Sequence, residues 1–266
     1  MKTQKQGLLT FALLTLTLAQ LACSMSAIQP TSTPAPTDTP NPTATITLTP
    51  TNTPRPSPTP RPTKTPNLAA TQRMDDFDAE AQSYFDEGYI KTRDGKIEEF
   101  DDFSYDWAQL NWYNWLSLDE TAADFYINAH FKWSNAYRNA NESGCGFLFA
   151  IQENGDHYAA FLDRAKIVFL DADHRASYSK YVSATNGTGR VKFDNPADHP
   201  IEADFTLIVN DQHAYVLVDG DLVGTYLLSQ FRDLNGEIGL SVLSGTNKDF
   251  GTRCEMTNIH VWLPNE

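Results

Sequence analysis

Beyond residue 92, hydrophobic and polar residues alternate along most of the chain. In the clearest stretch, residues 125–133, every odd-numbered position is apolar, and Asn128, His130 and Lys132 are among the polar residues between them. An alternation of period two is typical of a β-strand that buries one of its faces. This pattern predicts that residues 93–266 form a β domain.

Further hydrophobic runs follow, separated by turn-forming pairs such as Asn154-Gly155 and Asp219-Gly220. Short strands at this spacing, with no helical run between them, predict an all-β sandwich or barrel. The Asp219-Gly220 pair predicts a two-residue hairpin turn with positive φ, which glycine adopts without steric cost. The runs cover residues 146–152, 157–162, 166–170, 205–209, 214–218, 237–243 and 256–263.

Residues 67–92 follow a different period. Phe77, Ala81, Tyr84 and Phe85 recur at spacings of four, seven and eight, with acidic residues between them. This spacing places them on one face of a short amphipathic helix. Such a helix is only marginally stable alone, so we expect it to pack on the domain that follows. The alternative is a frayed connector.

Residues 24–66 are dominated by proline and threonine. Twelve of the fifteen prolines of the chain fall between Pro30 and Pro66. Such a composition cannot bury a core and favours the extended polyproline conformation. At roughly 3.1 Å per residue, residues 30–66 would reach about 115 Å. We interpret residues 24–66 as a disordered stalk that carries the β domain.

The first 23 residues have the layout of an export signal. Lys2 and Lys5 precede a short apolar run at residues 8–19, and Cys23 follows. The run is shorter than the ~20 residues of a transmembrane helix. The segment resembles a bacterial lipoprotein signal, although Gln20 stands where that family has Leu, Val or Ile. The resemblance implies lipidation at Cys23 and anchoring on the extracellular face of the cell membrane. The alternatives are a secretory peptide cut nearby and an uncut anchor.

Charge and cysteine content narrow the range of partners. The formal net charge is -14, and an acidic surface repels phosphate backbones, which argues against nucleic acid as a partner.

Besides Cys23, the chain contains Cys145 and Cys254. In an exported protein such a pair predicts a disulfide. The bridge would close a loop of about 110 residues and contribute about 4 kcal/mol.

The order of segments in the second half is typical of a known superfamily. Two strand-like runs meet the Asp219-Gly220 turn, Gly-x-Ile-Gly-Leu follows at 236–240, and Asn-x-x-Val-Trp closes the domain at 258–262. On these motifs, residues 97–263 resemble the concanavalin A-like jelly-roll superfamily, and within it the laminin-G-like and 3-keto-disaccharide-hydrolase-like branches. The resemblance implies two stacked antiparallel sheets with the first and last strands adjacent, which would bring Cys145 and Cys254 within bridging distance. These motifs are structural, so they imply a fold rather than an activity.

We find no catalytic motif in the sequence. Glycoside hydrolases of the superfamily carry Glu-x-Asp-x-x-Glu on one strand, whereas the nearest acidic strand here offers only Glu202 and Asp204. Residues 171–175, which include His174 and Arg175, are expected to form a solvated turn. We therefore predict no catalytic residue, no metal ligand and no cofactor at these positions.

Calcium is the one ion that the resemblance suggests, since related jelly rolls hold it with loop Asp and Asn side chains. The candidate ligands are Asp219 and Asp221, or Asn247 and Asp249. Acidic proteins carry such pairs in many loops, so these residues are more simply interpreted as polar turn residues.

Aromatic residues are concentrated near the start of the domain. Trp107, Trp112, Tyr113 and Trp115 lie within nine residues, interleaved with amide side chains. Proteins bind sugars by stacking an aromatic ring on the apolar face of the sugar, while amides bond to its hydroxyls. Alternation along a strand would turn Trp107, Tyr113 and Trp115 into the core and expose Trp112 with Asn114.

Three hypotheses for function follow. The first is a non-catalytic surface module that binds extracellular glycan or cell-wall polymer through Trp112, Asn114 and Tyr137, the last from a second polar-aromatic segment. The second is a glycoside hydrolase-like enzyme of the same superfamily, which requires two converging carboxylates. The third is a structural or adhesive envelope protein without an aromatic platform or polar pocket. The aromatic-amide segment and the missing catalytic motif favour the first.

Overall fold

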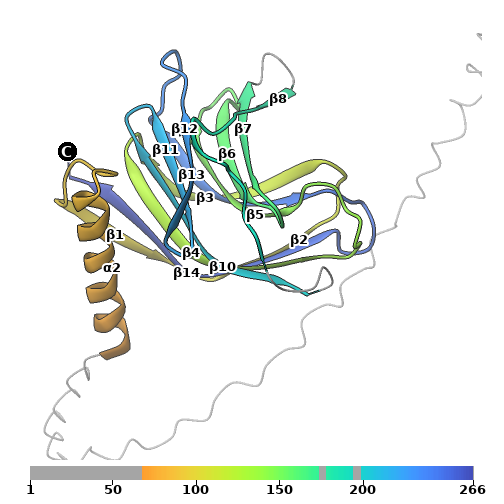
Figure 1. The fold of residues 1–266 in the computed structure, drawn as a ribbon, viewed down its shortest axis with the longest axis horizontal. Coiled ribbons are helices and arrows are strands. Elements are labelled where there is room, and N and C mark those ends of the chain that lie inside the picture. The colour runs from red at the N-terminus through yellow and green to blue at the C-terminus, as the bar shows by residue number, and fades with distance from the viewer. Residues whose placement is uncertain (1–67, 174–177, 194–198, 266) are drawn as a thin grey trace, which may run out of the picture. The chain divides into compact units, whose positions relative to one another are not determined.

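The computed structural model describes residues 68–173, 178–193 and 199–265, which form one helix and fourteen strands in two antiparallel sheets (Figure 1). The predicted all-β sandwich is thereby confirmed. The signal at 1–23 with Cys23, the stalk at 24–66, and His174 and Arg175 lie outside the described residues. Among those that are described, no helix has the length and apolar character needed to cross a bilayer.

The larger sheet has eight strands in the order β1-β14-β4-β10-β11-β12-β9, and β2 also pairs with β14. The first two strands therefore lie beside the last one, as the superfamily resemblance implies. The strands of this sheet are β1 (Gly95–Phe100), β2 (Phe103–Trp107), β4 (Phe125–Asn135), β9 (Asn186–Gly187), β10 (Ile201–Asn210), β11 (His213–Val218), β12 (Asp221–Leu227) and β14 (Thr252–Pro264).

The smaller sheet has six strands in the order β3-β13-β5-β6-β7-β8. Its β3 and β8 were not among the runs predicted from the alternation, because β3 mixes exposed and half-buried residues and β8 is short. The strands of this sheet are β3 (Trp112–Ala122), β5 (Gly144–Ile151), β6 (His157–Leu162), β7 (Ile167–Asp173), β8 (Tyr178–Tyr181) and β13 (Gly236–Ser244).

The main core lies between the two sheets. The apolar positions of β4 all point into it, as alternation predicts. Phe131 of β4 meets Phe147 of β5 across the gap, with ring centroids 5.1 Å apart, and stacks on Phe205 of β10 at 4.9 Å. Aromatic contacts of this kind add to the hydrophobic stabilisation from burial alone.

Helix α2 (Leu68–Asp86) packs on the outer face of the eight-stranded sheet. Phe77 stacks on Tyr126 with ring centroids 4.9 Å apart, and Tyr84 meets the same ring edge-on at 5.3 Å. Tyr126 is an outward-facing residue of β4, yet it is fully buried because the helix covers it. The helix predicted within 67–92 is present and ends at Asp86.

A disulfide between Cys145 and Cys254 joins the two sheets, as the cysteine count predicted. Cys145 lies on β5 and Cys254 on β14, with Cα atoms 5.5 Å apart and both residues buried in the main core. The bridge therefore fixes one sheet against the other.

Two local predictions have different outcomes. The Asp219-Gly220 turn has φ values of 51° and 83° and joins β11 to β12, as a two-residue hairpin with positive φ requires. The solvated turn expected at 171–175 is wrong for residues 171–173, which extend β7 and pair with β6 and β8. The polar residues of this segment indicated a turn. Asp171 can lie within a strand because it forms an ion pair with Arg232, a residue distant in the sequence.

Candidate functional site: an aromatic cleft on the six-stranded sheet

The outer face of the six-stranded sheet carries a second apolar layer. Along β5, Phe147 and Phe149 point into the main core, and Leu148 between them points outward. Outward-facing residues of neighbouring strands continue this layer, because strand pairing aligns side chains of one face. Its buried members are Tyr113, Leu148, Ala159, Phe161, Val168, Leu170 and Leu243.

A cleft of about 750 Å³ opens where this layer reaches the β4–β5 loop. Its walls come from the start of β3, the β4–β5 loop, the β6–β7 turn, β7, β8 and the end of β13. We call it the aromatic cleft; it is lined chiefly by Asn111, Trp112, Tyr113, Trp133, Arg138, Asn141, Glu142, Asp163, Val168, Leu170, Ser179, Tyr181 and Leu243.

Two of the lining aromatic side chains are strongly exposed. Trp112 is 51% exposed and Tyr181 is 59% exposed. The Trp112 ring lies nearly parallel to the buried ring of Tyr113, with centroids 5.7 Å apart and an interplanar angle of 14°. Trp112 is thereby supported by a fixed neighbour, while a large part of its own surface stays open to solvent.

Hydrogen-bonding groups surround these rings. Asn141 donates from Nδ2 to Oδ1 of Asn111 at 2.9 Å, which leaves further amide groups of both side chains available. The indole Nε1 of Trp133 is buried and has no hydrogen-bond partner among the described residues. An aromatic surface beside the accessible amide groups of Asn111 and Asn141 has the chemistry that a polyhydroxylated ligand requires.

Two carboxylates line the cleft, and both have protein partners. Glu142 accepts hydrogen bonds from Lys166 and Tyr181. Burial by itself would raise the pKa of Glu142, but these hydrogen bonds outweigh burial and lower it. The hydrogen bond to Glu142 in turn raises the pKa of Tyr181 to about 12.

The second carboxylate, Asp163, accepts backbone N–H groups from Ser143 at 3.1 Å and Ala165 at 3.1 Å. Burial raises its pKa in spite of these donors. Because its oxygens hold the β6–β7 turn and the start of β5, Asp163 is a structural residue of the cleft. Neither carboxylate is arranged as a free general acid or nucleophile.

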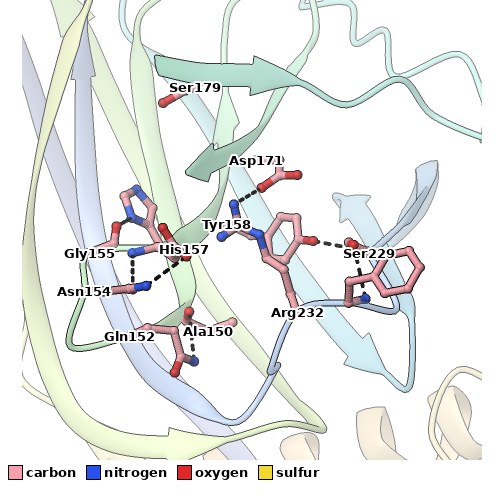
Figure 2. Close-up of polar contacts among 12 residues, drawn as sticks. Ala150, Gln152, Asn154, Gly155, His157, Tyr158, Asp171, Ser179, Ser229 and Arg232 are labelled. Carbon is pink, nitrogen blue, oxygen red and sulfur yellow. Dashed lines mark hydrogen bonds and ion pairs between the residues drawn. The ribbon is translucent and has the colours of Figure 1, made fainter. Parts of the chain in front are cut away.

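A buried histidine supports the floor beside the cleft. His157 Nε2 lies 2.7 Å from the Tyr113 hydroxyl, and its Nδ1 lies 2.8 Å from the Gly155 carbonyl oxygen. Figure 2 shows the ring turned toward Gly155, and Trp115 packs against it with centroids 5.5 Å apart. Since the carbonyl only accepts, Nδ1 carries the proton and Nε2 accepts from Tyr113. Burial lowers the pKa of His157 and keeps it neutral.

The end of the sandwich near His157 is closed by an ion pair. Arg232, from the segment before β13, places Nη2 2.6 Å from Asp171 Oδ1 and covers the Tyr158 ring at 5.3 Å (Figure 2). The Tyr158 hydroxyl accepts the backbone N–H of Ser229 at 2.9 Å. Burial raises the pKa of Asp171 against the opposing effect of Arg232. These contacts hold the rim of the sandwich.

The structure separates the three residues predicted to bind sugar. Trp112 lines the cleft, whereas Asn114 points elsewhere and donates to the Tyr105 hydroxyl at 3.1 Å. Tyr137 lies in the β4–β5 loop next to Arg138, beneath Lys248, whose Nζ is 3.8 Å from the ring centroid.

The predicted inward orientation of the other aromatic residues needs correction. Trp107 packs against the main core as expected. Tyr113 is buried, but in the outer layer, and Trp115 is 41% exposed. The outer face of β3 does not meet the other sheet: Tyr113 is buried there against Phe161 of β6, whereas Trp115 stays partly open to solvent.

A second hollow, of about 590 Å³, lies between α2 and the eight-stranded sheet. It contains His130, whose Nδ1 is 2.8 Å from Asp204 Oδ1, and the carboxyl group of Glu80, whose pKa is raised by burial. Glu202, the other acid of the predicted acidic strand, pairs with Lys132 at 3.2 Å. Among the described residues, no exposed Phe, Tyr or Trp side chain lines this hollow.

Metal binding finds no support in the described residues, where no group of three or more His, Cys, Asp or Glu side chains converges. Of the calcium candidates, Asp219 uses Oδ1 to accept the backbone N–H of Asp204 at 2.9 Å. This bond ties the hairpin turn to β10 and gives Asp219 a structural role.

Several cleft residues were missed from the sequence. Tyr181, Glu142 and Asn141 lie on different segments from Trp112 and come together only through strand order. The sequence offers one weak signal, the Tyr137-Arg138-Asn139 run, which places polar and aromatic residues in the loop that borders the cleft.

No family model and no curated protein matches this sequence. Among solved structures, the chain is similar to the carbohydrate-binding module CBM66 from Bacillus subtilis, with 12% identity and a TM-score of 0.42 over 61% of this chain and 92% of that one. Sheep galectin-11 in complex with glycerol shows 10% identity and a TM-score of 0.34, over 57% of this chain and 98% of the galectin. The Bacillus licheniformis β-glucanase shows 13% identity and a TM-score of 0.36, over 55% of this chain and 69% of the glucanase. The strand pairing establishes the two-sheet sandwich, and these likenesses assign no ligand to this chain.

Proposed function

We propose that this protein is a non-catalytic carbohydrate-binding module and that the aromatic cleft is its binding site. Exposed aromatic rings bind the apolar C–H faces of sugars, and neighbouring amides exchange hydrogen bonds with the hydroxyls. Both kinds of group line the same cleft in this chain. The ligand class is an extracellular glycan or a cell-wall polymer.

The observation that carries the proposal is the pair of half-exposed rings, Trp112 and Tyr181, in one cleft of about 750 Å³. Large aromatic side chains are normally buried in a sandwich of this size, because each buries more than 150 Å² of apolar surface. Other aromatic side chains such as Phe231 are also exposed, but these two line one cavity, and this grouping supports a binding surface. The Asn111–Asn141 amide pair supplies polar groups next to them.

The partners of the carboxylates support binding rather than hydrolysis. Hydrolysis of a glycosidic bond needs one carboxyl group as acid and a second as base or nucleophile. In the cleft, Glu142 is held by Lys166 and Tyr181, and Asp163 is held by backbone N–H groups. A hydrolase of the same superfamily remains the alternative that the assay below tests.

We infer from the sequence motifs that the domain belongs to the laminin-G-like and 3-keto-disaccharide-hydrolase-like branches of the concanavalin A-like superfamily. We also propose export and attachment to the outer face of the cell membrane through a lipid on Cys23. A disulfide in the core supports an oxidising compartment. Labelling with radioactive palmitate tests the attachment: the wild type should incorporate label and Cys23→Ala should not.

The test of the proposed function is a glycan array with polysaccharide pull-down, using the wild type, Trp112→Ala and Leu116→Ala. Leu116 is an exposed apolar residue of the same strand outside the cleft. We expect binding by the wild type and Leu116→Ala and its loss in Trp112→Ala. Release of reducing sugar would favour the hydrolase, and no binding by folded protein would favour a structural or adhesive envelope role.

A further inference from the structure

The aromatic cleft differs in charge from the protein as a whole. The protein carries a net charge of -14. In the cleft, however, the two acids are already engaged: Glu142 with Lys166 and Tyr181, and Asp163 with backbone N–H donors. A ligand therefore meets no unpaired carboxylate on Glu142 or Asp163.

Two arginines line the cleft: Arg164 donates to the His199 carbonyl oxygen at 2.9 Å, whereas Arg138 is in the opposite situation to the two acids. Arg138 is exposed, lines the cleft, and makes no hydrogen bond or ion pair with any residue that the structure describes. Next to it in the chain, Tyr137 holds Lys248 over its ring at 3.8 Å. No described carboxylate lies within ion-pair distance of the Lys248 ammonium group. Arg138 thus lines the cleft of a strongly acidic protein and Lys248 lies over the neighbouring Tyr137, and among the described residues neither cation has an acidic partner.

An arginine side chain presents several N–H donors in a rigid fork, and carboxylates match this fork with two parallel hydrogen bonds. A neutral sugar offers the exposed guanidinium of Arg138 only hydroxyl acceptors, whereas a sugar with a carboxylate would form a charge-assisted pair with it.

We propose that the aromatic cleft selects acidic saccharides: a uronic acid residue stacks on Trp112 and places its carboxylate on Arg138. This inference rests on the proposed function and adds the class of ligand to it. Lys248, whose ammonium group lies over the ring of Tyr137 in the same loop, contributes long-range attraction.

The experiment is titration calorimetry with trigalacturonate and with its methyl ester, two probes that differ in charge and share the sugar backbone. We expect the wild type to bind the acid about 10- to 100-fold more tightly than the ester, the range of one charge-assisted hydrogen-bonded pair. In Arg138→Gln the ratio of the two affinities should fall to about one. In Lys248→Gln it should fall by about two- to threefold, and by less at high salt.

A matched control removes the same charge elsewhere. Arg93 is exposed, near α2, with its guanidinium over Phe85 at 5.9 Å. Arg93→Gln should keep the full preference for the acid, and thermal unfolding confirms that each variant is folded.

Equal affinity of the wild type for acid and ester would overturn the inference, as would an Arg138→Gln variant that keeps the preference. So would the absence of trigalacturonate binding. The proposed function fails separately, when the glycan array shows no ligand at all or when Trp112→Ala binds every ligand as the wild type does.

Discussion

The two outer faces of the sandwich both carry apolar and aromatic residues, but only one of these faces is covered by a helix. On the eight-stranded sheet, α2 covers the face, so that Tyr126 and Trp262 pack in a closed cluster with Phe77 and Tyr84. On the six-stranded sheet, the buried layer around Phe161 leads into a cleft edged by half-exposed rings. One face is completed by a segment of the same chain.

The difference separates aromatic residues that stabilise the fold from those that we propose to bind a ligand. Tyr126 loses all its exposure to a helix that folds with the domain, whereas Trp112 and Tyr181 keep half of theirs. Apolar surface left in water is unfavourable, and exposed apolar side chains that gather beside a cavity are typical of a binding surface. We therefore expect substitutions on the face covered by α2 to change the stability of the domain, and substitutions in the aromatic cleft to change ligand affinity.

The largest effect is expected from breaking the bridge that holds both faces in register. The double variant Cys145→Ala, Cys254→Ala should lose about 4 kcal/mol of unfolding free energy, since the disulfide closes a loop with a sequence separation of 109 residues. Urea unfolding measures the loss. Reductant should destabilise the wild type and leave the double variant unchanged; an unshifted midpoint in the variant would contradict the prediction.

The covered face should respond to the loss of its helix anchor. Phe77→Ala removes a ring stacked on Tyr126, at an expected cost of about 3 kcal/mol. The matched control is Phe231→Ala: Phe231 is 89% exposed, and its truncation should change the free energy by less than about 0.5 kcal/mol. Equal effects of the two substitutions in urea unfolding would show that α2 does not stabilise the domain.

The open face should respond in affinity rather than in stability. Tyr181→Ala should weaken binding of the array-identified glycan about tenfold, because a stacking ring is lost. Tyr181→Phe keeps the ring and removes only the hydrogen bond to Glu142, so its affinity should stay within about threefold of the wild type. Calorimetry separates the two, and a larger loss in the Phe variant would assign the hydroxyl, not the ring, to binding.

A smaller effect, a loss of unfolding free energy at acidic pH, is expected from His157 beside the aromatic cleft. Burial holds the pKa of His157 below its ordinary value, so the unfolded chain takes up a proton before the folded one does. The stability that depends on neutral His157 is present above about pH 6.5 and falls as pH drops below it. His157→Gln should flatten this part of the curve of unfolding free energy against pH. The same slope in wild type and variant would exclude His157 as its source.

The smallest effect, of opposite sign, is expected at the covered face. Burial raises the pKa of Glu80, so the folded state favours the protonated carboxyl and the ionised form is a cost at neutral pH. Glu80→Gln should raise the urea midpoint slightly at pH 7. The Tyr84 hydroxyl donates a hydrogen bond to Glu80 Oε1 at 2.9 Å, and the amide oxygen of Gln can accept the same bond. Below pH 4 the difference from wild type should vanish; a lower midpoint at pH 7 would show that the carboxylate stabilises the helix.

Local patterns in the sequence determined the elements of the domain. The alternation at 125–133 specified β4, the spacing of Phe77, Ala81 and Tyr84 specified α2, and Asp219-Gly220 specified a hairpin with positive φ. Each depends on the conformation of a few consecutive residues, which the local sequence dictates. The Cys145–Cys254 bridge followed from the cysteine count together with the predicted export of the chain.

The tertiary structure decided which faces are covered and which residues meet at the cleft. Trp112, Glu142 and Tyr181 come together because β3 and β13 are sequence-distant neighbours and β5, β6, β7 and β8 follow in the same sheet. Alternation states that one face of a strand is apolar, but it does not state what lies against that face. The exposure of Trp115 and the burial of Tyr126 therefore depend on strand order and on the position of α2, which the sequence pattern does not contain.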